Sequence, residues 1–337
     1  MLRYVSILLM GLGSMSCTKD VEIPRDYDAL PSVVEPIGFE AIPYPSDNIF
    51  TTDRWALGKK LFYDKRLAVD STLSCASCHQ QDKGWADDLP LTPGIKDRPA
   101  VRNAPTLTNV AYHPYYTREG GVPTLEMQVL IPISEHNELG FNMARLVDRL
   151  SKDSIYQSMA QKAYNRSLDA YVITRALANF ERSLISGNSR ADQFNKGKQS
   201  LNEEEIAGRN LFYSTRTNCS QCHSGFNFTN YAFENNGLYT QYKDPGRYRL
   251  TLNPADSALF KVPTLRMVGH TSPYMHDGSI ATLEQVIDHY NSGGKNHPHK
   301  SILIRPLGLD NEEKRALVSF LKALNDEEFL GNRYFMP

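Results

Sequence analysis

Apolar side chains follow a helical period along much of the chain. Residues three and four positions apart are repeatedly apolar, which places them on one face of an α-helix. This pattern predicts helices at 57–63, 143–149, 154–164, 168–184, 207–213, 283–290 and 311–324. Another helix is expected to start after Ser200 or Asn202, because three glutamates follow and acidic side chains stabilise a helix N-terminus. Residues 226–259 lack the period and should form loops and short strands, so the expected fold class is mainly α with little β-structure.

Part of the pattern occurs twice. The sequence Leu-Gly-Lys-Lys-Leu-Phe-Tyr at 57–63 is matched by Ala-Gly-Arg-Asn-Leu-Phe-Tyr at 207–213, and each copy precedes a Cys-x-x-Cys-His pentapeptide. The segment 186–198 between the copies is rich in Gly, Asn and Ser, which is typical of a boundary. We therefore predict two tandem cytochrome c-like domains, at 48–190 and 191–337.

The two pentapeptides, Cys-Ala-Ser-Cys-His at 75–79 and Cys-Ser-Gln-Cys-His at 219–223, carry the clearest chemistry. In a c-type haem site two thiols form thioethers to the porphyrin, and the adjacent imidazole ligates the iron. A zinc site built from both cysteine pairs is the alternative, but zinc knuckles usually lie about 15–20 residues apart, and these lie much further apart. Two covalently bound haem c are therefore expected, held by Cys75, Cys78, His79, Cys219, Cys222 and His223.

The N-terminus has the features of an export signal. Arg3 precedes an apolar stretch at 5–12 that is too short to span a bilayer. Cys17 follows Ser-Met-Ser in a loose lipoprotein box, so we predict a signal peptide at 1–16, a diacylated Cys17 and a tether at 17–47. A plain signal peptide with an unrelated cysteine is the alternative. No other long apolar segment occurs, so we expect a lipid anchor in the periplasm or cell envelope and no membrane span.

The charge balance excludes one class of partner. A formal net charge of −1 over 337 residues gives no electrostatic basis for binding nucleic acid. A local patch for a redox partner can still exist within a neutral total.

The chain resembles the bacterial dihaem cytochrome c peroxidase family, which includes the MauG-type enzymes, over nearly all of 45–324. The resemblance rests on the pentapeptides and on Arg-Asn-Ala-Pro-Thr-Leu at 102–107, Gln-x-x-x-Pro at 128–132, Val-Pro-Thr-Leu-Arg at 262–266 and Thr-Ser-Pro-Tyr-Met-His-Asp-Gly at 271–278. It implies that the His79 haem reacts with hydrogen peroxide and that the His223 haem transfers electrons.

The same resemblance implies a distal pocket that contains Gln128, Pro132 and Glu138. A carboxylate near the iron can take a proton from one peroxide oxygen and return it to the other. Glu138 is therefore the expected acid–base group, Gln128 a hydrogen-bonding partner of peroxide, and Pro132 part of the wall. Glu135 and His136 are nearby alternatives to Glu138.

One departure from the family concerns the first haem. Many members carry a second His ligand on the peroxidatic iron, in the loop after the first pentapeptide. This chain has no His between His79 and His113, and the corresponding place falls in 91–95, where Ile95 cannot bind iron. A five-coordinate first haem that is open to peroxide in the ferric state is expected, with His113 as the alternative ligand.

A second departure concerns the other haem. Many members use Met as its sixth ligand, whereas the resemblance to the MauG type places Tyr290 there. A phenolate ligand would lower the reduction potential, whereas a thioether raises it. Met275 and Met267 are alternative ligands, and Tyr290 as a packing residue of its helix is a further alternative.

The resemblance also implies two features between the haems. A Trp usually helps electrons to cross, but Arg118 stands at the aligned position, which leaves Trp85, Tyr115 and Tyr116 as alternatives. A calcium ion is the second feature, because oxygen donors suit a hard cation. The residues that would bind it are Asn103, Thr271 and Pro273.

The expected function is the reduction of hydrogen peroxide to water with electrons from a small cytochrome c or cupredoxin. The first alternative is a MauG-like oxidase that modifies a partner protein by removing electrons over a long range. The second is a dihaem electron carrier without catalysis, which has no need of a polar distal pocket. Members of the family often dimerise, so a homodimer is also an expectation.

Overall fold

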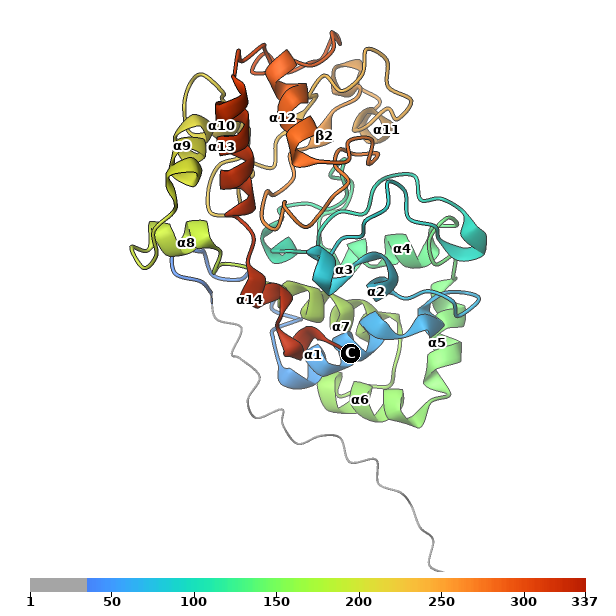
Figure 1. Cartoon of the computed structure of the whole chain (residues 1–337). Coiled ribbons are helices and arrows are strands. Elements are labelled where there is room, and N and C mark those ends of the chain that lie inside the picture. The colour runs from blue at the N-terminus through green and yellow to red at the C-terminus, as the bar shows by residue number, and fades with distance from the viewer. Residues whose placement is uncertain (1–34) are drawn as a thin grey trace, which may run out of the picture. The chain divides into compact units, whose positions relative to one another are not determined.

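Helices dominate residues 35–337, the part of the chain that the computed structural model describes (Figure 1). The α-helices are α1 Thr52–Tyr63, α2 Cys75–Cys78, α3 Leu125–Gln128, α4 Leu130–Ser134, α5 Met143–Ser151, α6 Ser154–Tyr164, α7 Ala170–Arg182, α8 Arg190–Asn195, α9 Glu203–Phe212, α10 Cys219–Cys222, α11 Tyr248–Thr251, α12 Leu283–Ser292, α13 Asn311–Lys322 and α14 Glu327–Leu330. Short 3-10 helices lie at Lys65–Leu67, Gln81–Lys83, Ile95–Asp97, Val110–Tyr112, Pro254–Asp256 and Arg333–Phe335. The strands β1 Phe233–Glu234 and β2 Phe260–Lys261 pair in antiparallel register. The mainly α fold class is confirmed.

The helices predicted from the apolar period are all present, and polar side chains set where they begin. Asn202 caps α9 by accepting a hydrogen bond from the backbone N–H of Glu205, so the cap is Asn202 and not Ser200. Asp169 caps α7 in the same way, which starts that helix two residues later than the apolar pattern suggested.

The segment 186–198 differs from the expected boundary loop, because α8 lies within it. Ser189 and Asp192 form a capping box at the start of this helix. Asp192 also forms a buried ion pair with Arg266, at 2.8 Å between Nη1 and Oδ2. The Ser and Asn residues that suggested a linker therefore serve as capping and packing groups.

One close helix crossing occurs in each half. α1 packs against α7, and α9 packs against α13. A Cβ on Gly58 would collide with the carbonyl of Ala176, and a Cβ on Gly208 would collide with that of Ala316. The glycine of each repeated segment therefore lets two helix backbones touch, which explains why Gly recurs at this place in both copies.

The C-terminal end returns to the first half. In Figure 1 the red segment that carries α14 lies beside the blue α1. The Tyr63 hydroxyl donates to the carbonyl of Phe335 at 2.6 Å, and Gln81 Nε2 donates to the carbonyls of Leu330 and Asn332, both at 2.8 Å. The C-terminal segment 330–335 is thus hydrogen-bonded both to the end of α1 and to the segment that follows the first pentapeptide.

The expected tether at 17–47 is too long. Ile42 is only 6% exposed, and the ring centroid of Phe39 lies 4.5 Å from that of Phe226. Phe39 and Ile42 therefore attach this segment to the folded chain, whereas Ile37 is exposed. The predicted signal peptide and Cys17 lie outside the described residues. Within the described residues, no helix is long and apolar enough to cross a membrane.

The helix crossing leads to a stability prediction for Gly208→Ala. Ala normally stabilises a helix interior by about 1 kcal/mol relative to Gly. Here the added methyl group meets the Ala316 carbonyl, so we expect a net loss of about 1–3 kcal/mol, as for other overpacked contacts. Chemical denaturation of the haem-loaded protein measures it. Asn210→Ala, at an exposed position of the same helix, is the control and should not destabilise. Equal stability of Gly208→Ala and wild type would contradict the close crossing.

Candidate active site

The two pentapeptides adopt the same local structure. Cys75–Cys78 and Cys219–Cys222 each form a single helical turn, α2 and α10, and the histidine follows as the C-terminal cap. The backbone N–H of His79 donates to the carbonyl of Cys75 at 3.0 Å, and His223 does the same to Cys219 at 2.9 Å. Two thiols and one imidazole are thereby placed on one turn, as attachment to a single porphyrin requires.

Each histidine ring is held by a backbone carbonyl. His79 Nδ1 lies 3.1 Å from the carbonyl of Trp85, and His223 Nδ1 lies 3.1 Å from that of Phe228. An imidazole that donates from Nδ1 presents its other nitrogen, Nε2, as a metal ligand. Burial lowers the pKa of His79 and lowers that of His223 to about 4, so both rings are neutral at neutral pH, as a ligand must be.

The surroundings of the two rings repeat as well. The carbonyls of Pro105 and Pro263 also face the His79 and His223 rings, respectively. The Thr that follows each Pro donates a hydrogen bond of 2.6 Å, from Thr106 to the Gly84 carbonyl and from Thr264 to the Asn227 carbonyl. The Pro-Thr-Leu motifs at 105–107 and 263–265 thus have one role in both halves, namely to fix the loop that holds the histidine.

The cysteines do not form a zinc site. No three His, Cys, Asp or Glu side chains within 35–337 are placed to share a metal ion. The four pentapeptide cysteines are free, and burial raises the pKa of each thiol, whereas metal binding requires the thiolate. Neutral thiols next to a neutral imidazole that is held by a hydrogen bond are suited to covalent haem attachment.

Glu138 lies beside the first pentapeptide. Burial raises its pKa to about 7, and the nearby Glu135 carboxylate contributes to the increase. After burial, the charge of Glu181 raises the pKa of Cys75 and that of Asp87 raises the pKa of Cys78, and the charge of Glu138 adds to both increases, so the carboxyl group is within electrostatic range of both thiols. A carboxyl group of this pKa can both accept and release a proton at neutral pH.

A loop after the first pentapeptide holds Glu138 in place. The backbone N–H of Ile95 donates to the carbonyl of Glu138 at 3.0 Å, and Ile95 is only 3% exposed. A Cβ on Gly94 would collide with the carbonyl of Asn137 and approach the Cα of Glu138. The segment 91–95, in which other family members are expected to carry an iron ligand, here places a buried isoleucine against the Glu138 backbone.

The other predicted distal residues come from the neighbouring helices. Pro132, in α4, accepts a hydrogen bond of 3.1 Å from the N–H of Leu139, which ties α4 to the Glu138 loop. Gln128 is the last residue of α3 and is half-buried. His136 is exposed, and its Nδ1 lies 3.2 Å from Arg98 Nη1, so it is less suited than Glu138 to a buried acid–base role.

Tyr290 lies beside the second pentapeptide, on α12. Burial raises its pKa to about 12, while a hydrogen bond from Asn236 opposes the increase. The charges of Cys219 and Cys222 contribute to the same shift, so the phenol is close to both thiols. Asn236 Nδ2 also lies 3.1 Å from the sulfur of Met275, the alternative sixth ligand of the second haem. Met275 therefore lies near Tyr290 through their common neighbour Asn236.

Met267 does not belong to the site. Its side chain is fully buried, and its sulfur accepts a hydrogen bond of 3.2 Å from the N–H of Asp326. It is a packing residue.

A longer repeat relates the two distal sides. An isolated bridge joins Tyr116 to Val122, and an equivalent bridge joins Tyr274 to Ile280. In both halves the next element begins with Thr-Leu-Glu and with the Thr as its cap, at 124–126 for α3 and at 282–284 for α12. Eight residues after the capping Thr stands Pro132 in one half and Tyr290 in the other. Comparison of the two Thr-Leu-Glu sequences could have found this relation.

The candidate relay residues are dispersed around the first half. Trp85 is fully buried, and its ring lies 5.8 Å from those of Phe62 and Phe335. Tyr115 stacks on Phe233 at 5.1 Å between ring centroids. Trp85 therefore acts through its carbonyl on His79 and packs its ring in the core, whereas Tyr115 lies against the β1 strand.

His113 lies in a different environment from the first pentapeptide. Its Nδ1 is 3.3 Å from Lys261 Nζ, and its ring contacts that of Tyr231 at 5.3 Å. Burial, followed by the charge of Arg118, lowers the pKa of Lys261 to about 7. These contacts give no support to His113 as the second ligand of the first haem.

The calcium expectation does not fit Asn103. Its N–H donates to the carbonyl of His276 at 3.0 Å, which brings it beside the segment that carries Thr271 and Pro273. Its carbonyl and its side-chain oxygen, however, already accept hydrogen bonds from the Arg118 guanidinium, at 2.8 and 3.1 Å. The side-chain oxygen of Asn103 that would bind calcium therefore already contacts a cation.

Comparisons with known proteins agree with this architecture. The sequence profile of the di-haem cytochrome c peroxidase family matches residues 52–200. The chain is 34% identical over 293 residues to the methylamine utilization protein MauG of Methylorubrum extorquens, covering 86% of this chain and 82% of the relative. It is 31% identical over 325 residues to the cytochrome-c peroxidase IdrP1 of Denitromonas iodatirespirans, covering 85% of each. The crystal structure of a MauG-like protein associated with microbial copper homeostasis superimposes with a TM-score of 0.83 and 32% identity, covering 91% of this chain and 97% of that one.

The chain belongs to the dihaem cytochrome c peroxidase and MauG family. Members of this family are oxidoreductases, and membership implies two haem c. The two pentapeptide sites described above are suited to hold them.

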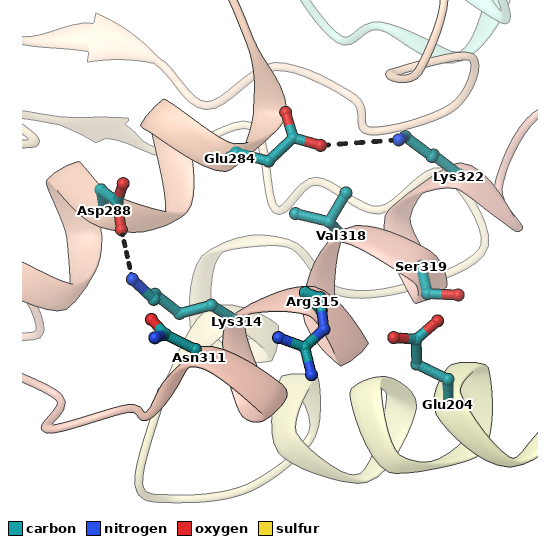
Figure 2. A pocket seen from close by; sticks show the side chains of 9 residues that line it. All are labelled: Glu204, Glu284, Asp288, Asn311, Lys314, Arg315, Val318, Ser319 and Lys322. Atoms are coloured by element: carbon teal, nitrogen blue, oxygen red, sulfur yellow. Dashed lines mark hydrogen bonds and ion pairs between the residues drawn. The ribbon is translucent and has the colours of Figure 1, made fainter.

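A surface cleft of about 470 Å³ lies apart from both pentapeptides (Figure 2). It is formed by α12, α13 and α9, and two ion pairs cross it, Asp288 with Lys314 at 2.9 Å and Glu284 with Lys322 at 3.6 Å. None of the predicted site residues lines it.

The loop contact leads to a prediction for Gly94→Ala. The backbone of Gly94, with φ −89°, is open to any residue, so only the close approach to Asn137 requires glycine. The added methyl group should displace Glu138, and a displacement of about 1 Å can lower a catalytic rate about 100-fold. Stopped-flow absorption after mixing with peroxide measures the rate. Leu91→Ala, exposed in the same loop, is the control. An unchanged rate in Gly94→Ala would show that this contact does not position Glu138.

Proposed function

We propose that this protein is a dihaem c-type peroxidase that reduces hydrogen peroxide to two waters, using two electrons and two protons. The electrons come from a small cytochrome c or cupredoxin and enter at the His223 haem, and peroxide reacts at the His79 haem. The protein acts in the periplasm or cell envelope and is anchored there by lipid on Cys17. When bound, the haems supply the iron that coordinates peroxide and the electrons that reduce it.

The observation that carries this proposal is Glu138. Cleavage of the O–O bond requires that one oxygen lose a proton and that the other gain one. A carboxyl group with a pKa of about 7 is present in both protonation states at neutral pH, and Glu138 has such a pKa because it is buried beside Glu135. An electron carrier has no use for a buried, proton-exchanging group at its haem, so Glu138 argues against the non-catalytic alternative.

Access to the first haem supports the same reaction. The loop at 91–95 contributes Ile95, which cannot bind iron and which contacts Glu138 through its backbone. The proposal therefore includes a first haem with one protein ligand, His79, whose distal side is available to peroxide in the ferric state. Gln128 and Pro132 complete the distal side, Gln128 as a hydrogen-bonding partner of peroxide.

A MauG-like oxidase that modifies a partner protein is the second candidate. The position of Tyr290 close to Cys219 and Cys222 favours it, because a phenolate on the second haem would lower the potential and favour the oxidised state. Arg118 argues for the peroxidase, because a guanidinium is not an oxidisable relay like Trp and its charge disfavours a positive hole nearby. Both candidates need Glu138 and differ in where the electrons come from.

Glu138→Gln tests the acid–base role. The amide cannot exchange protons, so we expect the rate of reaction with peroxide to fall by about 10²–10⁴-fold. In wild type the rate should rise with pH and level off above a midpoint near 7, because only the deprotonated Glu138 accepts the proton from peroxide. Stopped-flow rates across pH measure both effects.

Glu135→Gln is the matched control. It removes the negative charge that raises the pKa of Glu138, so it should shift the midpoint of the profile to lower pH while keeping the reaction. If Glu138→Gln kept the pH profile of wild type, the proposed acid–base role of Glu138 would be wrong.

Tyr290→Phe tests the second ligand. If the phenolate binds iron, its loss should change the EPR spectrum of the second haem and raise its reduction potential, within the roughly 0.8 V range that axial ligands span. Tyr242→Phe, whose residue also lies near Asn236, is the control and should leave both unchanged. An unaltered spectrum in Tyr290→Phe would leave Tyr290 as a packing residue.

A further inference from the structure

An arginine guanidinium lies against neutral oxygen atoms where the two haem-binding segments meet. Arg118 Nη2 donates to the backbone carbonyl of Asn103 at 2.8 Å and to its side-chain Oδ1 at 3.1 Å, and Arg118 Nε donates to the same carbonyl at 3.3 Å. In the part of the chain that the structure describes, every hydrogen bond placed on this guanidinium ends on Asn103. The arrangement is that of a cation held by amide oxygens.

The carboxylates around Arg118 are engaged with other groups. Arg102 binds Asp244 at 2.6 Å and also pairs with Glu119, which Arg249 contacts as well. Arg118 feels these charges at longer range but shares no direct ion pair with them. Burial, followed by the charge of Arg102, lowers the pKa of Arg118 to about 10, while nearby carboxylates oppose the decrease. The guanidinium therefore stays charged at neutral pH, and its direct contacts are with neutral oxygens.

Arg118 joins the segments that hold the two histidines. Asn103 stands two residues before Pro105, whose carbonyl faces His79. The carbonyl of Arg118 accepts a hydrogen bond of 2.7 Å from the N–H of Lys261, which stands two residues before Pro263, whose carbonyl faces His223. One residue thus connects the two proximal loops, through its side chain to one and through its backbone to the other.

We propose that the guanidinium of Arg118 is the resident cation of this junction and takes the place of a calcium ion at Asn103. Amide and carbonyl oxygens are the donors that a hard cation uses. Even with its lowered pKa of about 10, the Arg118 guanidinium stays protonated at neutral pH. A calcium ion on the same oxygens would be repelled by the guanidinium, so the two cations exclude each other.

The haem-loaded protein tests this with calcium itself as the probe. Wild type is dialysed against a chelator, and its calcium content, thermal unfolding and ferric absorption spectrum are measured with and without added calcium chloride. We expect about zero equivalents of bound calcium, and no change in melting temperature or spectrum when calcium is added. One tightly held equivalent, or a fall in melting temperature on chelation, would overturn the proposal.

Two variants separate charge from packing. Arg118→Gln frees the oxygens of Asn103 and should bind about one equivalent of calcium, with a melting temperature that rises with calcium concentration. Arg118→Lys keeps the charge and should stay independent of calcium. Arg249→Gln, which removes a charge from the same cluster without touching Asn103, is the control and should also stay independent.

The variants contradict the proposal if Arg118→Gln folds but binds no calcium, because the site would then not accept a cation. If Arg249→Gln bound calcium to the same extent, the net charge of the cluster, and not the oxygens of Asn103, would control whether calcium binds, and the proposal would be wrong. If Arg118→Gln does not fold, the calcium content of wild type and of Arg118→Lys still decides: calcium retained by either one overturns the proposal.

Discussion

Each half of this protein depends on an imidazole ring held against a backbone carbonyl. The bond from His79 to Trp85 and the bond from His223 to Phe228 have the same length, 3.1 Å. Trp85 and Phe228 have φ of 62° and 49°, a conformation that residues other than glycine rarely adopt. The Thr of each Pro-Thr-Leu motif bonds the carbonyl just before this residue and so supports the loop. Because the ring cannot rotate, its free nitrogen has one direction in which to bind iron.

The two pentapeptide sites share the same backbone arrangement, as expected of a duplicated unit. They differ in the side chains on their distal sides, as expected of copies that have diverged. The close helix crossing, the pinned histidine and the Thr-Leu-Glu helix start all occur in both halves. At the equivalent position on the distal side one half has Pro132 and the other Tyr290. The first half adds Glu138, whose charge reaches the thiols of its pentapeptide. One scaffold can thus present different side chains on the distal sides of its two pentapeptide sites.

The junction between the halves is built from paired charges. Arg102, Glu119 and Asp244 form one network, and Arg118 and Lys261 connect it to the two proximal loops. Arg102, Glu119 and Asp244 are stable there because each has a partner of opposite charge, whereas Arg118 contacts the neutral oxygens of Asn103. Arg118 is hydrogen-bonded to both segments that lead to the two proximal loops, so a positive charge is fixed between the halves.

The sequence by itself determined the features that are local. Haem attachment was readable because five consecutive residues form the whole motif, and the helices were readable because their period repeats over ten residues or so. The helix α8 was missed, because its Ser189 cap looks like linker composition until Arg266, far along the chain, pairs with Asp192. Glu138 could be named from resemblance, but its pKa of about 7 depends on its partial burial and on Glu135, and its backbone is held by a loop whose close approach requires Gly94. The contact of Arg118 with Asn103 likewise required the tertiary structure, because hydrogen bonds between distant segments leave no periodic trace in a sequence.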